Sequence, residues 1–262
     1  MKRCLLFFLS LALVSLVTAG CRQAPPAAAP PQSPTATPTK AVAPTHTPVA
    51  EPISAGELPN LIGSLHWLGH ASFRLDGPPV IYIDPTSLEA APPQADIILI
   101  SHEHQDHFSP PILKQISRPE TVIVASQRVA DKLKGVEGEV RALKPGERTT
   151  VGEVEIETVP AYNIDKSFHP KTAGNLGFIV TLGGERLYFA GDTDHIPEMA
   201  DIQCDVALLP IGGTYTMDVK EAAAAAADIG PRVAVPMHER SADPEQFREL
   251  CDCEVIILEV AH

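Results

Sequence analysis

From about residue 61 onward, short apolar runs alternate with polar loops, a pattern that predicts a domain of mixed strands and helices. Strands are predicted at residues 65–68, 80–83, 97–100, 122–124, 206–209, 233–235 and 255–258, of which 97–100 and 206–209 are expected to be buried. Alternation of apolar and polar residues over 148–160 predicts a strand pair with one exposed face. Residues 178–182 and 187–189 flank Gly183-Gly184 and predict a β-hairpin.

Helical signals separate these strands. Helices are predicted to begin at Pro110 and to cover residues 127–134, 222–227 and 244–250. Proline suits a first helical turn, Gly135 suits a helix end, and Asp218 followed by Glu221 forms a capping box. Strands mixed with helices, then paired as hairpins, then alternating with helices again predict an α/β arrangement of packed sheets with helices outside.

The N-terminus has the pattern of a secretory signal, which we place at residues 1–20. Two basic residues precede an apolar stretch over 5–17, which is shorter than the ~20 residues that a membrane-spanning helix needs. Cys21 after Ala19-Gly20 resembles the bacterial lipobox, although Thr18 stands where such boxes usually carry Leu. The resemblance implies that Cys21 is lipidated. An ordinary signal peptide and an uncleaved anchor are the alternatives.

Residues 22–60 are rich in Pro, Ala and Thr. Such a segment cannot bury a core, so we predict a disordered, partly extended linker. The predicted organisation is therefore a signal peptide at 1–20, a lipid-anchored Cys with its linker at 21–60, and one domain at 61–262. This organisation predicts a protein tethered to a bacterial cell membrane on its extracytoplasmic side.

Composition narrows the class of partner. The chain has 262 residues, of which 44% are hydrophobic, which is enough for one substantial core. Its formal net charge is −13 and it has no long basic run. Because phosphate backbones attract Lys and Arg, we expect no nucleic-acid partner. A small-molecule substrate, including a small phosphodiester, stays compatible with this charge.

Three imidazoles and two carboxylates stand together in the stretch 101–107, directly after the predicted strand 97–100. In an extended loop the side chains of His102 and His104 point the same way and can bind one ion, while Asp106 and His107, after a bend, can face a second. Neutral imidazole and carboxylate are ligands of Zn²⁺-like ions, and two such ions can share one activated water. A solvated, His-rich turn is the alternative.

Further ligands are expected at other strand ends. His169 is the only histidine between His107 and Asp192, and is expected to be the third ligand of the first ion, the alternative being a solvated loop histidine. Asp192 follows an apolar strand and can bridge both ions, and His238 follows residues 233–235 in the same way. The predicted metal ligands are His102, His104, His169, Asp106, His107, Asp192 and His238.

These motifs together resemble those of the metallo-β-lactamase superfamily over about residues 61–260. A subgroup of metal-dependent hydrolases with Gly-His-Ala near the start is more similar still. The segments that carry this likeness are Gly69–Ser72, Pro160–Asn163, His169–Lys171, Gly191–Asp194, Leu209–Gly213, Tyr215–Asp218 and Pro236–His238. The resemblance implies a four-layer αββα sandwich with the site at one edge of the two sheets. It also implies that Asp84 supports the metal loop through hydrogen bonds.

We therefore predict a dinuclear metal-dependent hydrolase whose metal-bridging hydroxide attacks an ester, lactone, amide or phosphodiester bond. Asp106 and His70 are the predicted catalytic residues, although His70 has hydrogen bonding within its loop as its alternative role. Candidates for substrate binding are Tyr162, Asn163, Gly212 and Gly213. The ions are expected to be zinc, with manganese and iron as alternatives. The alternative functions are a phosphodiesterase for small substrates and, in a different class, a membrane-tethered metal- or solute-binding lipoprotein.

Overall fold

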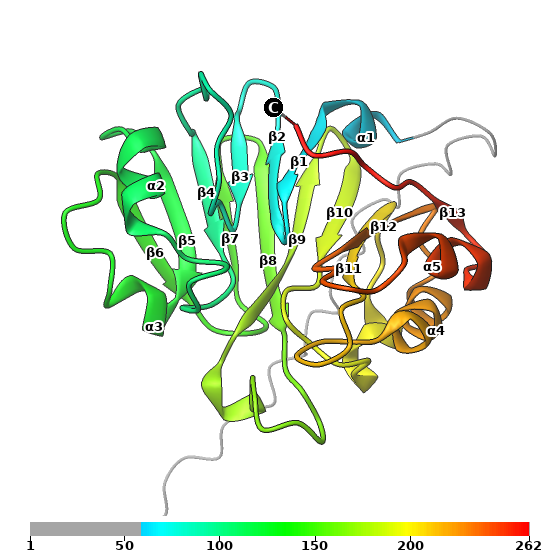
Figure 1. Cartoon of the computed structure of the whole chain (residues 1–262). Helices are drawn as coiled ribbons and strands as arrows, with labels where there is room; N and C mark the ends of the chain where they lie inside the picture. Colours follow the sequence, from blue (N-terminus) through cyan, green and yellow to red (C-terminus); the bar gives the residue numbers. More distant parts are fainter. Residues whose placement is uncertain (1–58, 262) are drawn as a thin grey trace, which may run out of the picture. The chain divides into compact units, whose positions relative to one another are not determined.

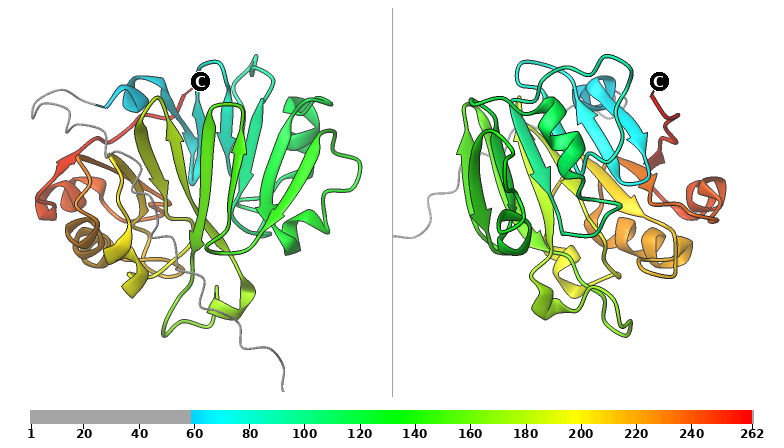
Figure 2. Two further views of the ribbon diagram at one scale, coloured as in Figure 1. Left: turned by 180° about the vertical axis from the view of Figure 1, so that it is seen from behind. Right: turned by 60° about the vertical axis from the view of Figure 1, so that its left-hand side comes forward.

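The computed structural model describes residues 59–261. They form two mixed β-sheets packed face to face, with helices on the outer faces (Figures 1 and 2). The strand order is β1-β2-β3-β4-β5-β6 in the first sheet and β13-β12-β11-β10-β9-β8-β7 in the second. The predicted αββα sandwich is therefore confirmed. The predictions for the signal peptide, Cys21 and nearly all of the linker lie outside the described residues.

The first sheet consists of β1 (Leu65–Gly69), β2 (Ser72–Leu75), β3 (Ile81–Ile83), β4 (Ile97–Ile100), β5 (Val122–Ser126) and β6 (Glu139–Leu143). The second consists of β7 (Arg148–Val151), β8 (Val154–Pro160), β9 (Leu176–Leu182), β10 (Glu185–Phe189), β11 (Val206–Pro210), β12 (Val233–Met237) and β13 (Glu254–Val255). The helices are α1 (Asn60–Ser64), α2 (Pro110–Ile116), α3 (Gln127–Ala130), α4 (Val219–Ile229) and α5 (Pro244–Leu250), with short 3₁₀ turns η1 (Lys171–Ala173) and η2 (Pro197–Asp201).

Two elements of the first sheet have no apolar run in the sequence. β2 is fully buried but contains Arg74, whose guanidinium pairs with Asp76 and Glu89. β6 is an edge strand with mostly exposed residues, so it shows no clear alternation. Two predicted elements are shorter than expected: α3 ends at Ala130, and the last strand covers Glu254–Val255 in place of 255–258.

The sandwich contains two apolar cores, which explains why the central strands are apolar on both faces. Ile97 and Leu99 of β4 point into the core between the sheets, while Ile98 and Ile100 point into a second core beneath α2 and α3. On the other side, α4 covers the second sheet with buried alanines. Its N-terminus carries the predicted capping box, in which Asp218 accepts from the backbone of Glu221 at 2.9 Å.

Loops from both sheets are joined by backbone hydrogen bonds at the edge where several of the predicted ligands lie. The amide of Leu176 donates to the carbonyl of Ser101 at 3.1 Å, which joins β9 to the loop after β4. The amide of His238 donates to the carbonyl of His70 at 3.0 Å, which joins the end of β12 to the β1–β2 turn. The sandwich therefore holds the ends of separate strands in one place. Within residues 59–261, no helix has the length and apolarity to cross a membrane.

Candidate metal centre

The first cluster consists of His102, His104 and His169. Nδ1 of His104 lies 3.1 Å from Nε2 of His102 and 3.0 Å from Nε2 of His169. His102 and His104 come from the loop after β4, and His169 comes from the long loop between β8 and β9. Three imidazole nitrogens that converge within 4.8 Å of one another have the arrangement of ligands around a single cation.

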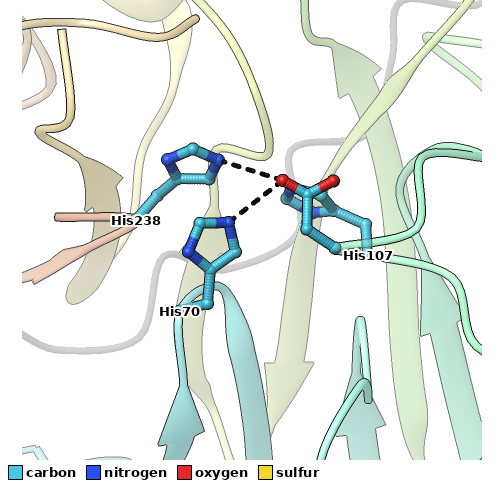
Figure 3. Close-up of side chains that lie close together, drawn as sticks. His70, His107 and His238 are labelled. Atoms are coloured by element: carbon cyan, nitrogen blue, oxygen red, sulfur yellow. Dashed lines mark hydrogen bonds and ion pairs between the residues drawn. The ribbon is translucent and has the colours of Figure 1, made fainter. Parts of the chain in front are cut away.

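The second cluster consists of His70, Asp106, His107 and His238, whose ligand atoms also lie within 4.8 Å of one another. Oδ2 of Asp106 is 3.2 Å from Nε2 of His70 and 3.9 Å from Nε2 of His238. Figure 3 shows how the three labelled histidines of this cluster, His70, His107 and His238, lie close together. His70 was expected near the site as a catalytic residue. The structure places it beside the candidate ligands of this cluster, with its ring 3.9 Å from the ring of His238.

Asp192 lies between the two clusters. Its Oδ2 is 3.5 Å from Nε2 of His169 in the first cluster and 3.4 Å from Nε2 of His238 in the second. Its Oδ1 is 3.2 Å from Nε2 of His107. The carboxylate thus faces both groups of nitrogens, which is the position expected of a bridging ligand.

The imidazoles are oriented by hydrogen bonds through their other ring nitrogens. Nδ1 of His102 is 2.9 Å from Oγ of Ser101, and Nδ1 of His169 is 3.2 Å from the carbonyl oxygen of Tyr215. Such contacts leave Nε2 free to bind a cation, and they hold the ring in place. Asp84 does the same for His107, and its other oxygen accepts from the Ser101 amide at 2.7 Å. Both oxygens of Asp84 are thus engaged, in agreement with the supporting role that the resemblance implies.

Several ligand atoms at this centre are buried and have no hydrogen-bond partner among the described residues. They are both ring nitrogens of His238, together with Nε2 of His107 and Oδ1 of Asp192, which face each other only as an ion pair at 3.2 Å. A buried polar atom without a partner costs free energy, on the order of 1–3 kcal/mol. A divalent cation would supply the missing partner, and a set of imidazole and carboxylate donors suits zinc, manganese or iron. The residues therefore fit the metal ions that the sequence predicts.

Burial and neighbouring charges set the protonation of these side chains. Burial lowers the pKa of His102 and of His169, so both are neutral and able to bind metal. Burial would also lower the pKa of His107, but the Asp192 carboxylate outweighs it and the pKa is raised. In the same way, burial would raise the pKa of Asp192, but His107 holds it well below its usual range. A cation at this centre would replace the His107 proton as the partner of Asp192.

Backbone strain is concentrated in the same residues. Among the described residues, the non-glycine positions with positive φ are His70, Asp84, His169, His238 and Arg240, at 54°, 43°, 52°, 50° and 52°. Side chains in this left-handed region cost roughly 1–2 kcal/mol each, and such residues cluster at functional sites. Four of the five belong to the clusters or support them.

A pocket of about 310 Å³ opens beside the clusters. It is lined by His104, Asp106, Phe168, His169, Asp192, Tyr215 and Arg240. Phe168 and Tyr215 make an edge-to-face contact with ring centroids 4.6 Å apart, and the Arg240 guanidinium lies 4.7 Å from the Tyr215 ring centre. Phe168, Tyr215 and Arg240 are not among the site residues predicted from the sequence. A pocket of similar volume, about 330 Å³, lies between α4 and α5, but no predicted metal ligand lines it.

Two of the predicted substrate-binding residues have other contacts. The Tyr162 hydroxyl donates to Glu198 at 2.9 Å, and Tyr162 does not line the metal pocket. Nδ2 of Asn163 donates to the carbonyl of Tyr215 at 2.8 Å and to that of Phe168 at 3.1 Å. Asn163 therefore holds together the two loops beside His169 and does not line the metal pocket.

Gly212 and Gly213 do not line the metal pocket either. A Cβ atom on Gly212 would lie 2.4 Å from the carbonyl oxygen of His238, so the glycine permits a close approach of two backbones. The Gly213 amide is engaged, because it donates to the carbonyl of Met217 at 2.9 Å. Gly212 thus supports the backbone of His238, and the predicted contact of both glycines with a substrate stays a prediction.

Comparisons with known proteins agree with this geometry. A sequence profile described as "Beta-lactamase superfamily domain" matches residues 64–238. A "UPF0173 metal-dependent hydrolase" of Pyrococcus furiosus is 37% identical over 216 residues, which cover 73% of this chain and 94% of that protein. The crystal structure of a protein described as a metal-dependent hydrolase from Parabacteroides distasonis has a TM-score of 0.68 and 33% identity, covering 75% of this chain and 93% of that one.

Igni18, described as a metallo hydrolase from Ignicoccus hospitalis, has a TM-score of 0.64 and 26% identity, and covers 76% of this chain and 95% of its own. The match of the profile covers most of the described residues, and the Pyrococcus relative is aligned over nearly its full length. The chain belongs to the metallo-β-lactamase superfamily and, within it, to the family of the UPF0173 proteins.

Proposed function

We propose that this protein is a dinuclear metal-dependent hydrolase. The observation that carries the proposal is the position of Asp192, whose carboxylate faces the histidines of both clusters at 3.2–4.0 Å. The names of the relatives, which describe metal-dependent hydrolases, support the same class of reaction. The proposed ligands are His102, His104 and His169 for one ion, Asp106, His107 and His238 for the other, and Asp192 for both.

Two divalent cations held there would lower the pKa of a shared water toward about 7 and stabilise negative charge on the substrate oxygen. The hydrogen bond from His70 lowers the pKa of Asp106, so its carboxylate is ionised at neutral pH and can accept a hydrogen bond from the attacking water. His70 reaches Asp106 from the β1–β2 turn at 3.2 Å, and its side chain is partly exposed. We assign His70 the task of holding a proton for the leaving group.

The proposed substrate is a small molecule with an ester, lactone, amide or phosphodiester bond. The pocket of about 310 Å³ has the size of a small-molecule site. All of these bonds develop negative charge on oxygen during attack by water, so one centre can serve any of them. A substrate panel that includes a phosphodiester is therefore part of the test.

Metal content of the full chain tests this proposal. We expect about two equivalents of zinc, manganese or iron in the parent protein, and about one in each of the variants His169→Ala and His238→Ala. His195→Ala is the matched control, because His195 pairs with Asp228 outside both clusters and its loss should leave the metal content unchanged.

Absence of bound metal would overturn the proposal. Two bound equivalents without hydrolysis of any member of the panel would favour the alternative, a metal- or solute-binding protein. Unchanged metal content in His169→Ala would show that the third ligand of the first ion is wrongly assigned.

We further propose that the protein is anchored to the extracytoplasmic face of a bacterial membrane through lipidated Cys21. The support is the sequence alone: a basic start, an apolar stretch and small residues before the cysteine. Expression of the full chain with labelled palmitate should label the parent and not Cys21→Ser, and the variant should leave the membrane fraction. Equal labelling of both proteins would refute the anchor.

A further inference from the structure

Among the described residues, the metal pocket is lined by one cationic side chain, Arg240. The carboxylates of Asp106 and Asp192 line the same pocket. Arg240 follows His238 by two residues, at the start of the loop between β12 and α5. The hydrolytic mechanism proposed for the metal centre does not use Arg240.

The backbone of Arg240 groups it with the metal site. It is the fifth non-glycine residue with positive φ in the described chain, and the other four belong to the clusters or support them. Strain of this kind persists only where the surrounding structure imposes it. The loop after His238 is thus shaped to bring Arg240 to the pocket wall.

Contacts with the side chain hold it in that position. The guanidinium lies over the Tyr215 ring at 4.7 Å from its centre, and a Cβ on Gly212 would approach the Arg240 stem to 3.3 Å. The absence of a side chain at Gly212 therefore leaves room for the aliphatic part of the Arg240 side chain, and the Tyr215 ring supports its guanidinium. A guanidinium stacked on a ring still has N–H donors at its edge that can bind an anion.

Arg240 has no carboxylate partner in the part of the chain that the structure describes. Within residues 59–261, its guanidinium forms neither an ion pair nor a hydrogen bond to a side chain. Most other described arginines have such a partner; Arg118, for example, pairs with Asp96 and Arg128 with Glu103. An arginine that is positioned but unpaired beside a reaction site is available for a ligand anion.

We propose that Arg240 determines substrate specificity by binding a carboxylate or phosphate group of the substrate, remote from the bond that is cleaved. The aromatic pair Phe168 and Tyr215 then contacts the apolar part of the same molecule. The proposed substrate is an anionic ester, amide or related compound with an aromatic or apolar body. This inference rests on the proposed function, because it assumes that the pocket admits the substrate.

Matched substrates test the inference in the full, metal-loaded chain. The anionic substrates are 3-carboxyphenyl acetate and 3-phosphonophenyl acetate, and the neutral one is 3-carbamoylphenyl acetate, all of which release acetate and a phenol. In Arg240→Met we expect KM for one or both anionic esters to rise about 10- to 100-fold, with the neutral ester unchanged. The two anionic esters distinguish a carboxylate site from a phosphate site.

Two further variants serve as comparisons. Arg240→Lys should recover part of the preference for the anion, because Lys retains the charge but not the planar donor pair. Arg248→Met removes an exposed arginine of α5 that pairs with Glu245, so it should leave the preference unchanged.

Binding of 3-hydroxybenzoate and 3-hydroxybenzamide, measured by calorimetry, does not depend on turnover. Weaker binding of the benzoate alone in Arg240→Met supports the inference even if no ester is hydrolysed, whereas absence of hydrolysis counts against the proposed function. Equal losses for charged and neutral compounds, or no loss for either, would overturn the role of Arg240.

Discussion

Nδ1 of His107 lies 2.7 Å from Oδ2 of Asp84, and both side chains are fully buried. The contact fixes which nitrogen of the imidazole faces the metal centre, because Nδ1 is occupied and Nε2 points toward Asp192 at 3.2 Å. Asp84 also accepts from the backbone and hydroxyl of Ser101, so one carboxylate supports the start of the metal loop as well as its last ligand.

We expect Asp84→Asn to weaken metal binding in the cluster that contains His107 by about 10- to 100-fold. The amide has nearly the shape of the carboxylate but no charge, so the loop can fold while the support of His107 is lost. Metal titration of the apo-protein measures the affinity of each site. Asp96→Asn, a change at an ion-paired carboxylate remote from the clusters, is the control. Equal metal affinity in Asp84→Asn and the parent would contradict the supporting role.

Asp192→Ala should remove both metal equivalents, whereas His169→Ala and His238→Ala should each remove one. The reason is that the Asp192 carboxylate faces nitrogens of both clusters, at 3.5 Å for His169 and 3.4 Å for His238. Elemental analysis after dialysis gives the stoichiometry, and circular dichroism verifies that the variants are folded. One retained equivalent in Asp192→Ala would show that this carboxylate does not bridge.

The proposed metal ligands could be predicted from the sequence because most of them directly follow an apolar strand. His102–His107 comes after β4, and His238 comes directly after β12. Residues at the ends of rigid strands have predictable positions, and the resemblance to a known superfamily indicates the order of the ligands along the chain. The sandwich could be predicted for the same reason, since β3, β4, β5, β11 and β12 are buried over their whole length.

The residues that line the pocket beside the clusters could not be predicted from the sequence in this way. Phe168, Tyr215 and Arg240 come from three loops with no shared spacing, and only the folded chain brings them together. Conversely, Tyr162 and Gly212 stand in motifs close to the ligands, yet their side-chain and backbone contacts turn away from the pocket. Proximity in sequence to a ligand indicates the region of a site but not the direction in which a side chain points.

Gly212→Ala should destabilise the protein by about 1–3 kcal/mol, the usual cost of overpacking, and should lower the metal occupancy of the His238 cluster. The added Cβ would lie 2.4 Å from the His238 carbonyl oxygen, so the backbone that carries this ligand has to move. Urea unfolding gives the stability. Gly63→Ala in α1 is the control, because no atom lies within 4 Å of its added Cβ and alanine favours a helix. A Gly212→Ala protein with parental stability and metal content would contradict this account.

The last prediction concerns acid stability and the ion-paired cluster on β2. Arg74 is only 5% exposed and is held by Asp76 and Glu89, while His66 lies 2.9 Å from Asp76. The hydrogen bond from Arg74 lowers the pKa of Asp76 below its usual value of 3.8, against the effect of partial burial. Because the folded state favours the ionised carboxylate, this pair contributes stability above about pH 4 and loses it as the pH falls further.

Asp76→Asn should therefore lower the free energy of unfolding at pH 7 by about 1 kcal/mol, a value kept small because Asp76 is partly exposed and Glu89 still pairs with Arg74. The difference from the parent should shrink as the pH falls below about 4, since the parent loses the same contact by protonation. Urea unfolding between pH 3 and pH 7 measures both, with Glu249→Gln, an exposed change on α5, as the control. A difference that stays constant across this range would mean that Asp76 acts through packing and not through its charge.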